Sequence, residues 1–226
     1  MIQVTNIKKQ YKEAVVLDIP KLDIPKSECF GLVGNNGAGK TTLFRIMLDL
    51  VRATAGKVEI DARDVSKTED WKKTTGAYLD EHMLLSYLTA DEYFQTLRKI
   101  YGLSEADLQL HLSKFTEFFN DEIVGKKKYI RDLSKGNLKK VGIAAPEVVF
   151  LDEPFENLDP SSQIRLKKLI LQEKETSQVT FLISSHDLTH VTEICDRIVL
   201  LEKGKIINDL RDKSAMLAEL DAYFTG

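Results

Sequence analysis

A run of glycines followed by a lysine and two threonines has the composition of a phosphate site. It reads Gly34-Asn35-Asn36-Gly37-Ala38-Gly39-Lys40-Thr41-Thr42. Glycine lets consecutive backbone N–H groups turn inward around phosphates, because no side chain stands in the way. The Lys40 ammonium can reach the β- and γ-phosphates of a nucleotide, and the Thr41 hydroxyl can ligate Mg²⁺. This segment, called the phosphate loop below, therefore predicts a nucleotide site that also holds a metal ion.

Two adjacent carboxylates follow an apolar segment later in the chain. The segment Val148–Leu151 has the pattern of a buried strand, and Asp152 and Glu153 come directly after it. In an open α/β sheet, ligands bind at the carboxyl ends of the strands. Asp152 would hold Mg²⁺ directly or through water, and Glu153 would orient and polarise an attacking water. The pair predicts hydrolysis of the terminal phosphate.

The segments around these motifs indicate an α/β sheet. We expect a strand at Cys29–Val33 and a helix over Leu43–Val51, so the phosphate loop would end at a helix N-terminus, which favours an anion. Val179–Ile183 is a further apolar strand, and a helical pattern over 161–174 separates it from Val148–Leu151. Strands that alternate with helices imply a parallel sheet with crossover helices.

The beginning, middle and end of the chain differ in pattern. Short apolar runs broken by turns predict strands up to about Ile60, and the segments 197–202 and 205–208 predict a hairpin. Capping-box spacing at Thr89 and Ser104 opens two stretches with helical apolar spacing. We therefore expect one α/β domain over residues 1–226, with a helical insertion at about 83–140.

Composition and charge exclude several classes of protein. The longest apolar runs are far shorter than the roughly 20 residues that cross a bilayer as a helix. The first residues lack the pattern of a secretory signal, so we expect a cytoplasmic location. Cys29 and Cys195 have no metal-like spacing, which favours a reduced, structural role. A formal net charge of -3 offers no general attraction to nucleic acid, and Lys126–Lys128 is more typical of a solvated loop.

A further motif, Leu133-Ser134-Lys135-Gly136-Asn137, lies upstream of Asp152 and Glu153. With this segment and the two motifs above, essentially the entire chain resembles the ATPases of ABC transporters, whose signature reads LSGGQ. The resemblance implies a P-loop NTPase fold: a RecA-like parallel sheet core, an N-terminal antiparallel β subdomain and an inserted α-helical subdomain. It also implies ATP and Mg²⁺ as cofactors, separate membrane-spanning permease subunits, and a second nucleotide-binding subunit as partner.

The resemblance assigns roles to five further residues. Ser134 and Gly136 would approach the γ-phosphate from the other chain, and Asp159 would lie in a loop across the dimer interface. His186 would be the histidine that contacts the γ-phosphate and the catalytic carboxylate, and Tyr11 would stack on adenine. Without the resemblance, Ser134 is also a suitable helix N-cap, Asp159 a turn residue, and Tyr11 an ordinary packed tyrosine.

The sequence departs from the family pattern at several points. Lys135 replaces a glycine and Asn137 a glutamine of the signature. Glu81 takes the place of a glutamine that contacts Mg²⁺ or the attacking water, and it adds a negative charge to the site; a surface turn without a role is the alternative. About one and a half helical turns are missing between Ala145 and Pro146, through a deletion or through residues absent from the sequence.

The leading hypothesis is an ATPase that couples hydrolysis to movement of a membrane partner on the inner face of the cell membrane, contacted near Tyr78–Leu88. The phosphate loop and its flanks look most like those of bacterial multidrug or antibiotic exporters. A soluble ABC-type ATPase that acts on nucleic acid or ribosomes is the alternative, although no tandem cassette, long coiled coil or basic surface supports it. A regulatory module that only binds ATP is disfavoured because Glu153 and His186 are retained.

Overall fold

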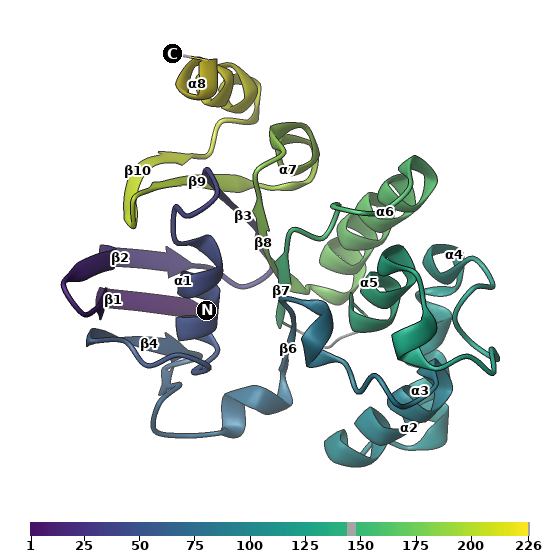
Figure 1. Ribbon diagram of the computed structural model, residues 1–226. Coiled ribbons are helices and arrows are strands. Elements are labelled where there is room, and N and C mark those ends of the chain that lie inside the picture. Colours follow the sequence, from purple (N-terminus) through teal and green to yellow (C-terminus); the bar gives the residue numbers. More distant parts are fainter. Residues whose placement is uncertain (144–147, 226) are drawn as a thin grey trace.

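The computed structural model describes residues 1–143 and 148–225, and it contains two sheets and a group of helices (Figure 1). The predicted shortfall between Ala145 and Pro146 lies outside the described residues. Among the described helices, none is long and apolar enough to cross a membrane.

One sheet is antiparallel and lies in the N-terminal part of the chain, as the short apolar runs predict. Its strand order is β2-β1-β4-β5. The strands are β1 (Ile2–Tyr11), β2 (Ala14–Ile24), β4 (Ala55–Ile60) and β5 (Arg63–Asp64). Ile2 pairs with Ile24 on one side and with Ile60 on the other, so buried apolar side chains gather in one row across the sheet.

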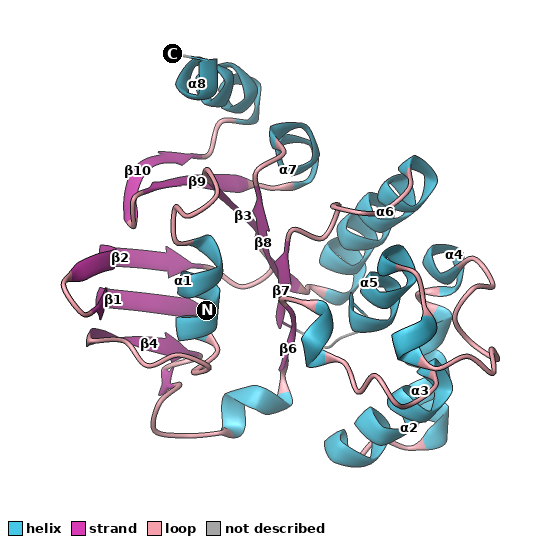
Figure 2. Ribbon diagram, in the orientation of Figure 1, coloured by secondary structure: helices cyan, strands magenta, loops and turns pink. Residues whose placement is uncertain are grey.

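The second sheet is parallel apart from its last strand, and it carries both sequence motifs. Its order is β10-β9-β3-β8-β7-β6, and only β10 runs antiparallel, as the predicted hairpin with β9 (Figure 2). The strands are β3 (Cys29–Val33), β6 (Thr75–Tyr78), β7 (Val148–Asp152), β8 (Thr180–Ser185), β9 (Arg197–Glu202) and β10 (Lys205–Leu210). The phosphate loop follows β3 and the carboxylates end β7, with β8 between these strands, so both motifs reach the same edge.

Helices connect these strands. They are α1 (Lys40–Met47), α2 (Ala90–Tyr101), α3 (Glu105–Ser113), α4 (Thr116–Phe119), α5 (Lys135–Ile143), α6 (Pro160–Ser177), α7 (Leu188–Ile194) and α8 (Lys213–Thr225), with short 3-10 turns η1 (Asp70–Lys73), η2 (Glu81–Met83) and η3 (Ile130–Asp132). Capping boxes at Thr89 and Ser104 begin α2 and α3, as predicted. Helices α2 to α5 lie between β6 and β7 in the chain; the limits 83–140 for the insertion remain a prediction.

The observed helix, α1, differs at both ends from the helix predicted over Leu43–Val51, so both predicted limits are wrong. It begins at Lys40, because Gly39 adopts a left-handed conformation with φ 110° and serves as its N-cap. It ends at Met47, because Asp49 is also left-handed, with φ 51°, and turns the chain out of the helix. The backbone N–H groups of the next two residues then both donate to the Arg45 carbonyl and close the helix end.

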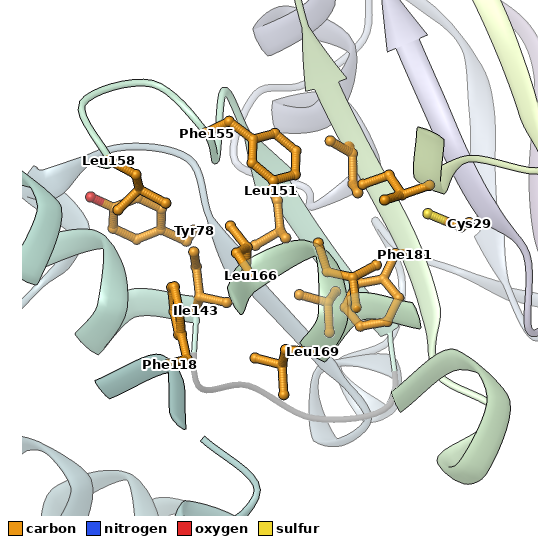
Figure 3. Packing of buried hydrophobic residues seen from close by; sticks show 14 of the residues in the cluster. Cys29, Tyr78, Phe118, Ile143, Leu151, Phe155, Leu158, Leu166, Leu169 and Phe181 are labelled. Atoms are coloured by element: carbon orange, nitrogen blue, oxygen red, sulfur yellow. The ribbon is translucent and has the colours of Figure 1, made fainter. Parts of the chain in front are cut away.

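The parallel sheet is buried on both faces. Phe150 of β7 faces α1 and the antiparallel sheet, where its ring meets that of Phe44 at 5.4 Å. Its neighbour Leu151 faces the other way, with Phe181 and Leu166, toward the helices (Figure 3). This burial explains the unbroken apolar runs in the sequence. The predicted structural role of the cysteines agrees with the packing, since both are buried, with their Sγ atoms 3.8 Å apart.

Candidate functional site

The phosphate loop is a tight turn between β3 and α1 in which a side chain would not fit at Gly34 or at Gly39. A Cβ atom at Gly34 would lie 2.2 Å from the Leu201 carbonyl oxygen. Gly39 requires glycine for a second reason, because its φ of 110° is unfavourable for any other residue. Lys40 is buried at the start of α1, and its ammonium donates to the Gly34 carbonyl at 2.6 Å. The Lys40 side chain therefore points back to the start of the phosphate loop.

The first carboxylate of the pair meets the phosphate loop directly. The Thr41 hydroxyl donates to Asp152 Oδ2 at 2.6 Å, although the two residues are far apart in sequence. The fully buried Ser184, the last residue but one of β8, donates to the other oxygen of Asp152. A hydroxyl and a carboxylate side by side supply the oxygen ligands that Mg²⁺ takes together with phosphate oxygens and water. These residues therefore fit the predicted metal.

The second carboxylate lies between the phosphate loop and the predicted histidine. Glu153 Oε1 is 3.5 Å from the Lys40 ammonium, and Glu153 Oε2 is 3.0 Å from His186 Nδ1. The backbone of Glu153 is left-handed, with φ 47°, and its N–H donates to the Ser184 carbonyl at 3.1 Å. An uncommon backbone conformation for a side chain of this type therefore aims the carboxylate.

A cleft of about 350 Å³ opens beside the two carboxylates. It is lined by Tyr78, Leu79, Asp80, Glu81, His82, Lys135, Lys139, Asp152, Glu153, Glu156 and Asn157. Asp80 accepts from the His82 N–H and pairs with Arg45 at 3.3 Å, so its carboxylate already has partners. Glu81 lines the same cleft and is the other acidic group of this turn. Burial, followed by the Glu81 charge, raises the pKa of Tyr78.

Two polar residues of the site were not predicted. Lys139 is buried on α5 and donates through its ammonium to the backbone carbonyl of Glu153. Burial lowers its pKa, against the opposing effect of nearby carboxylates. Ser184 contacts both Asp152 and the N–H of Glu153. Each had a signal in the sequence: a lysine within an apolar helical pattern, and a serine that directly follows an apolar strand pattern, two residues before His186.

The signature segment faces a different cavity, of about 510 Å³. This cavity is lined by Glu122, Ser134, Lys135, Gly136, Asn137, Lys140, Asn157 and Asp159. In the described part of the chain, no residue of the phosphate loop lines it. Ser134 accepts from the Asn137 N–H at 3.2 Å, as a helix N-cap does, and a Cβ at Gly136 would lie 3.2 Å from the Asn157 carbonyl oxygen. One chain therefore does not bring Ser134 and Gly136 to its own phosphate loop.

The two remaining predicted residues lie at the margins. Asp159 is the N-cap of α6, and hydrogen bonds from the hydroxyls of Ser161 and Ser162 hold its pKa well below the usual range. Tyr11 ends β1 and is 49% exposed, with the Lys9 ammonium 4.5 Å from its ring centroid. A hydrogen bond between Tyr11 and the phosphate loop is not found within the described residues.

Comparison with known proteins gives one consistent result. The sequence profile of the family described as "ABC transporter" matches residues 17–156. The lantibiotic transport ATP-binding protein SrtF of Streptococcus pyogenes is 31% identical over 226 residues, which cover 97% of this chain and 95% of that protein. An uncharacterised ABC transporter ATP-binding protein of Synechocystis is 34% identical over 81% of this chain, and the match spans 53% of that relative.

Solved structures agree with the fold. The ATP-binding subunit of an ABC transporter superposes with a TM-score of 0.88 at 25% identity and covers 100% of both chains. The dimeric cassette MJ0796, in a post-hydrolysis state bound to ADP and phosphate, gives a TM-score of 0.82 at 22% identity, over 93% of this chain and 98% of that one. The predicted fold class is therefore confirmed.

Proposed function

The chain belongs to the ATP-binding proteins of ABC transporters, and from that premise we propose that it couples ATP-driven dimerisation and ATP hydrolysis to export through separate membrane subunits. The observation that carries the proposal is the meeting of Thr41, Asp152, Glu153 and His186 at one sheet edge. Hydrolysis needs both a metal ligand and a group that orients water within reach of the γ-phosphate. Export is supported by the lantibiotic transport relative.

Each residue of the proposed site has a distinct task. The backbone of the phosphate loop and Lys40 would bind the phosphates, and Tyr11 would stack on adenine. Thr41, Asp152 and Glu81 would hold Mg²⁺, which neutralises charge on the phosphates when bound. Glu153 would orient the attacking water, and His186, which contacts Glu153 at 3.0 Å, would bind the γ-phosphate.

The signature segment has its proposed partner in a second copy of the chain. Because Ser134 and Gly136 line a cavity apart from their own phosphate loop, a complete site needs the partner subunit's Ser134 and the partner subunit's Gly136. A two-fold homodimer would place two ATP molecules between the subunits, with Asp159 near the interface. The dimeric cassette structure supports this arrangement.

The contact with the permease is proposed for Tyr78–Leu88. The segment after Glu81 is bonded to the residues just before the signature: the Ile130 N–H donates to the Leu88 carbonyl at 2.7 Å, and the Arg131 N–H donates to the Ser86 carbonyl at 2.9 Å. Movement of a membrane partner would therefore reach the signature segment directly. The protein would lie at the cytoplasmic face of the membrane, and nucleic acid would not be a partner. The comparisons do not favour the alternative of an ATPase that acts on nucleic acid or ribosomes.

Trapping the dimer tests the proposal. Glu153→Gln keeps the shape of the side chain but impairs its role with water, so the variant should form a stable dimer in excess ATP and Mg²⁺. Light scattering measures its mass. Adding Ser134→Arg should obstruct the facing site and return the protein to a monomer. If the double variant dimerises as readily as Glu153→Gln, Ser134 does not face ATP across an interface and the mechanism is wrong.

A further inference from the structure

A buried lysine joins the signature helix to the carboxylate pair. Lys139 lies on α5 and is only 8% exposed, yet its hydrogen bond goes to a neutral backbone group, the carbonyl of Glu153. Within the described ranges, Lys139 forms no ion pair with a carboxylate. An ammonium is costly to bury, so a buried lysine held by a carbonyl indicates a requirement at that carbonyl.

The carbonyl belongs to the residue with the uncommon backbone. Glu153 is left-handed, with φ 47°, directly after β7. Its N–H is fixed by the carbonyl and the hydroxyl of Ser184 on β8, at 3.1 and 3.2 Å. Its carbonyl is fixed by Lys139. The peptide groups on both sides of Glu153 are therefore held, each by a different element, and the direction of the side chain follows from them.

We propose that Lys139 is a positioning residue for Glu153, and that it ties the direction of the Glu153 carboxylate to the position of the signature helix. This inference rests on the proposed role of Glu153. Lys139 follows the N-cap Ser134 by five residues, so the two lie about 7.5 Å apart along one short helix. A helix of this length moves as a unit. When Ser134 moves toward or away from a nucleotide, Lys139 carries the same movement to Glu153.

A simpler explanation is that Lys139 only balances negative charge in the cleft. Burial lowers the pKa of Lys139, and the negative charges of Glu156, Glu153 and Asp152 oppose that shift, so these carboxylates do act on the ammonium. The two explanations differ in what they require. Charge balance needs a cation, whereas positioning needs an N–H donor that reaches the Glu153 carbonyl. Glutamine supplies a donor without charge on a slightly shorter chain, and methionine supplies the chain without a donor.

The experiment compares Lys139→Met and Lys139→Gln in steady-state hydrolysis of ATP with Mg²⁺. Misplacement of a reacting group by about 1 Å can lower a rate about a hundredfold, so Lys139→Met should lower kcat by roughly tenfold to a hundredfold. The KM for ATP should stay unchanged, because Lys139 does not contact the phosphate loop. Lys139→Gln should recover most of kcat. Lys205→Met, at the exposed start of β10, is the matched control and should behave like the unchanged protein.

A second readout separates positioning from a general effect on folding. In the Glu153→Gln background, Lys139→Met should leave ATP-dependent dimerisation unchanged, because the carboxylate that Lys139 positions is already gone. Should Lys139→Met fail to fold, Lys139→Asn replaces it: asparagine carries the same amide as glutamine but is too short to reach the carbonyl. Turnover in Lys139→Gln together with loss of turnover in Lys139→Asn then supports the inference.

Three results would overturn it: normal kcat in Lys139→Met, equal losses in the Met and Gln variants, or loss of dimerisation when Lys139→Met is added to Glu153→Gln. Turnover of the Glu153→Gln variant shows whether the role of Lys139 or the proposed function itself is wrong. If Glu153→Gln retains turnover, the assignment of Glu153 itself is wrong. If Glu153→Gln abolishes turnover while Lys139→Met does not, only the link through Lys139 is wrong.

Discussion

Replacing Gly142 by alanine tests how helix α5 packs on strand β6. A Cβ atom at Gly142 would lie 2.0 Å from Cδ2 and 2.5 Å from Cε2 of the Tyr78 ring, closer than non-bonded atoms can approach. The ring cannot move aside into solvent, because Tyr78 is only 4% exposed. Helix α5 would have to shift, and with it the signature segment at its N-terminus.

Two effects of this substitution oppose each other. Alanine favours a helix over glycine by about 1 kcal/mol. Overpacking of a well-packed core costs about 1–3 kcal/mol, and contacts as short as these belong at the upper end of that range. The expected net loss in the free energy of unfolding is therefore about 2 kcal/mol, which in a chain of this length lowers Tm by roughly 4–8 °C.

Urea unfolding of Gly142→Ala, alone and combined with Tyr78→Ala, measures the effect. Tyr78→Ala removes the ring, so Gly142→Ala should be neutral or stabilising in that background, where its methyl group enters space that the ring has left. A stabilised single variant would refute the reasoning, because helix propensity alone would then decide the outcome. Equal destabilisation in both backgrounds would equally refute it, because the clash would not involve Tyr78.

Glu81→Gln should retain turnover or raise it a few-fold, because it removes a negative charge beside Asp152 and Glu153; hydrolysis measured over a range of Mg²⁺ concentrations checks this, and a loss as large as that of Glu153→Gln would assign the carboxylate its own role. Asp209→Asn should cost about 2 kcal/mol of unfolding free energy at neutral pH, less than for a fully buried pair, because Asp209 is 42% exposed. The Arg197 guanidinium, which donates to both carboxylate oxygens at 2.6 Å, lowers the pKa of Asp209. The stabilisation is thus complete above the unfolded pKa of about 3.9 and is lost as pH falls through the lower folded pKa. Urea unfolding at several pH values should show that the free energies of unfolding of the unchanged protein and of Asp209→Asn become more similar in acid. A difference that does not change with pH would contradict the assignment.

Features that depend on neighbouring residues alone were predictable from the sequence. The phosphate loop needs glycine where its backbone is left-handed or meets another backbone. These glycines, Gly39 among them, lie within one short segment and can be recognised from the sequence. The strand before Asp152 is recognisable because a sheet buried on both faces needs an unbroken apolar run. Capping boxes at Thr89 and Ser104 are equally local, since each cap bonds to a residue three positions further on.

Contacts between distant segments were decided by the tertiary structure. Parallel pairing of β3, β8 and β7 brings Ser184 to Asp152, and nothing in either segment specifies the other as its partner. The same holds for Lys139: its helix could have turned the ammonium toward solvent, and only the packing of α5 against β6 directs it to Glu153. The end of α1 is an exception among the local features: a left-handed Asp49 overrides an apolar periodicity that continues beyond it. The sequence determined which groups are present, and the packing of the sheet and helices determined which of them meet.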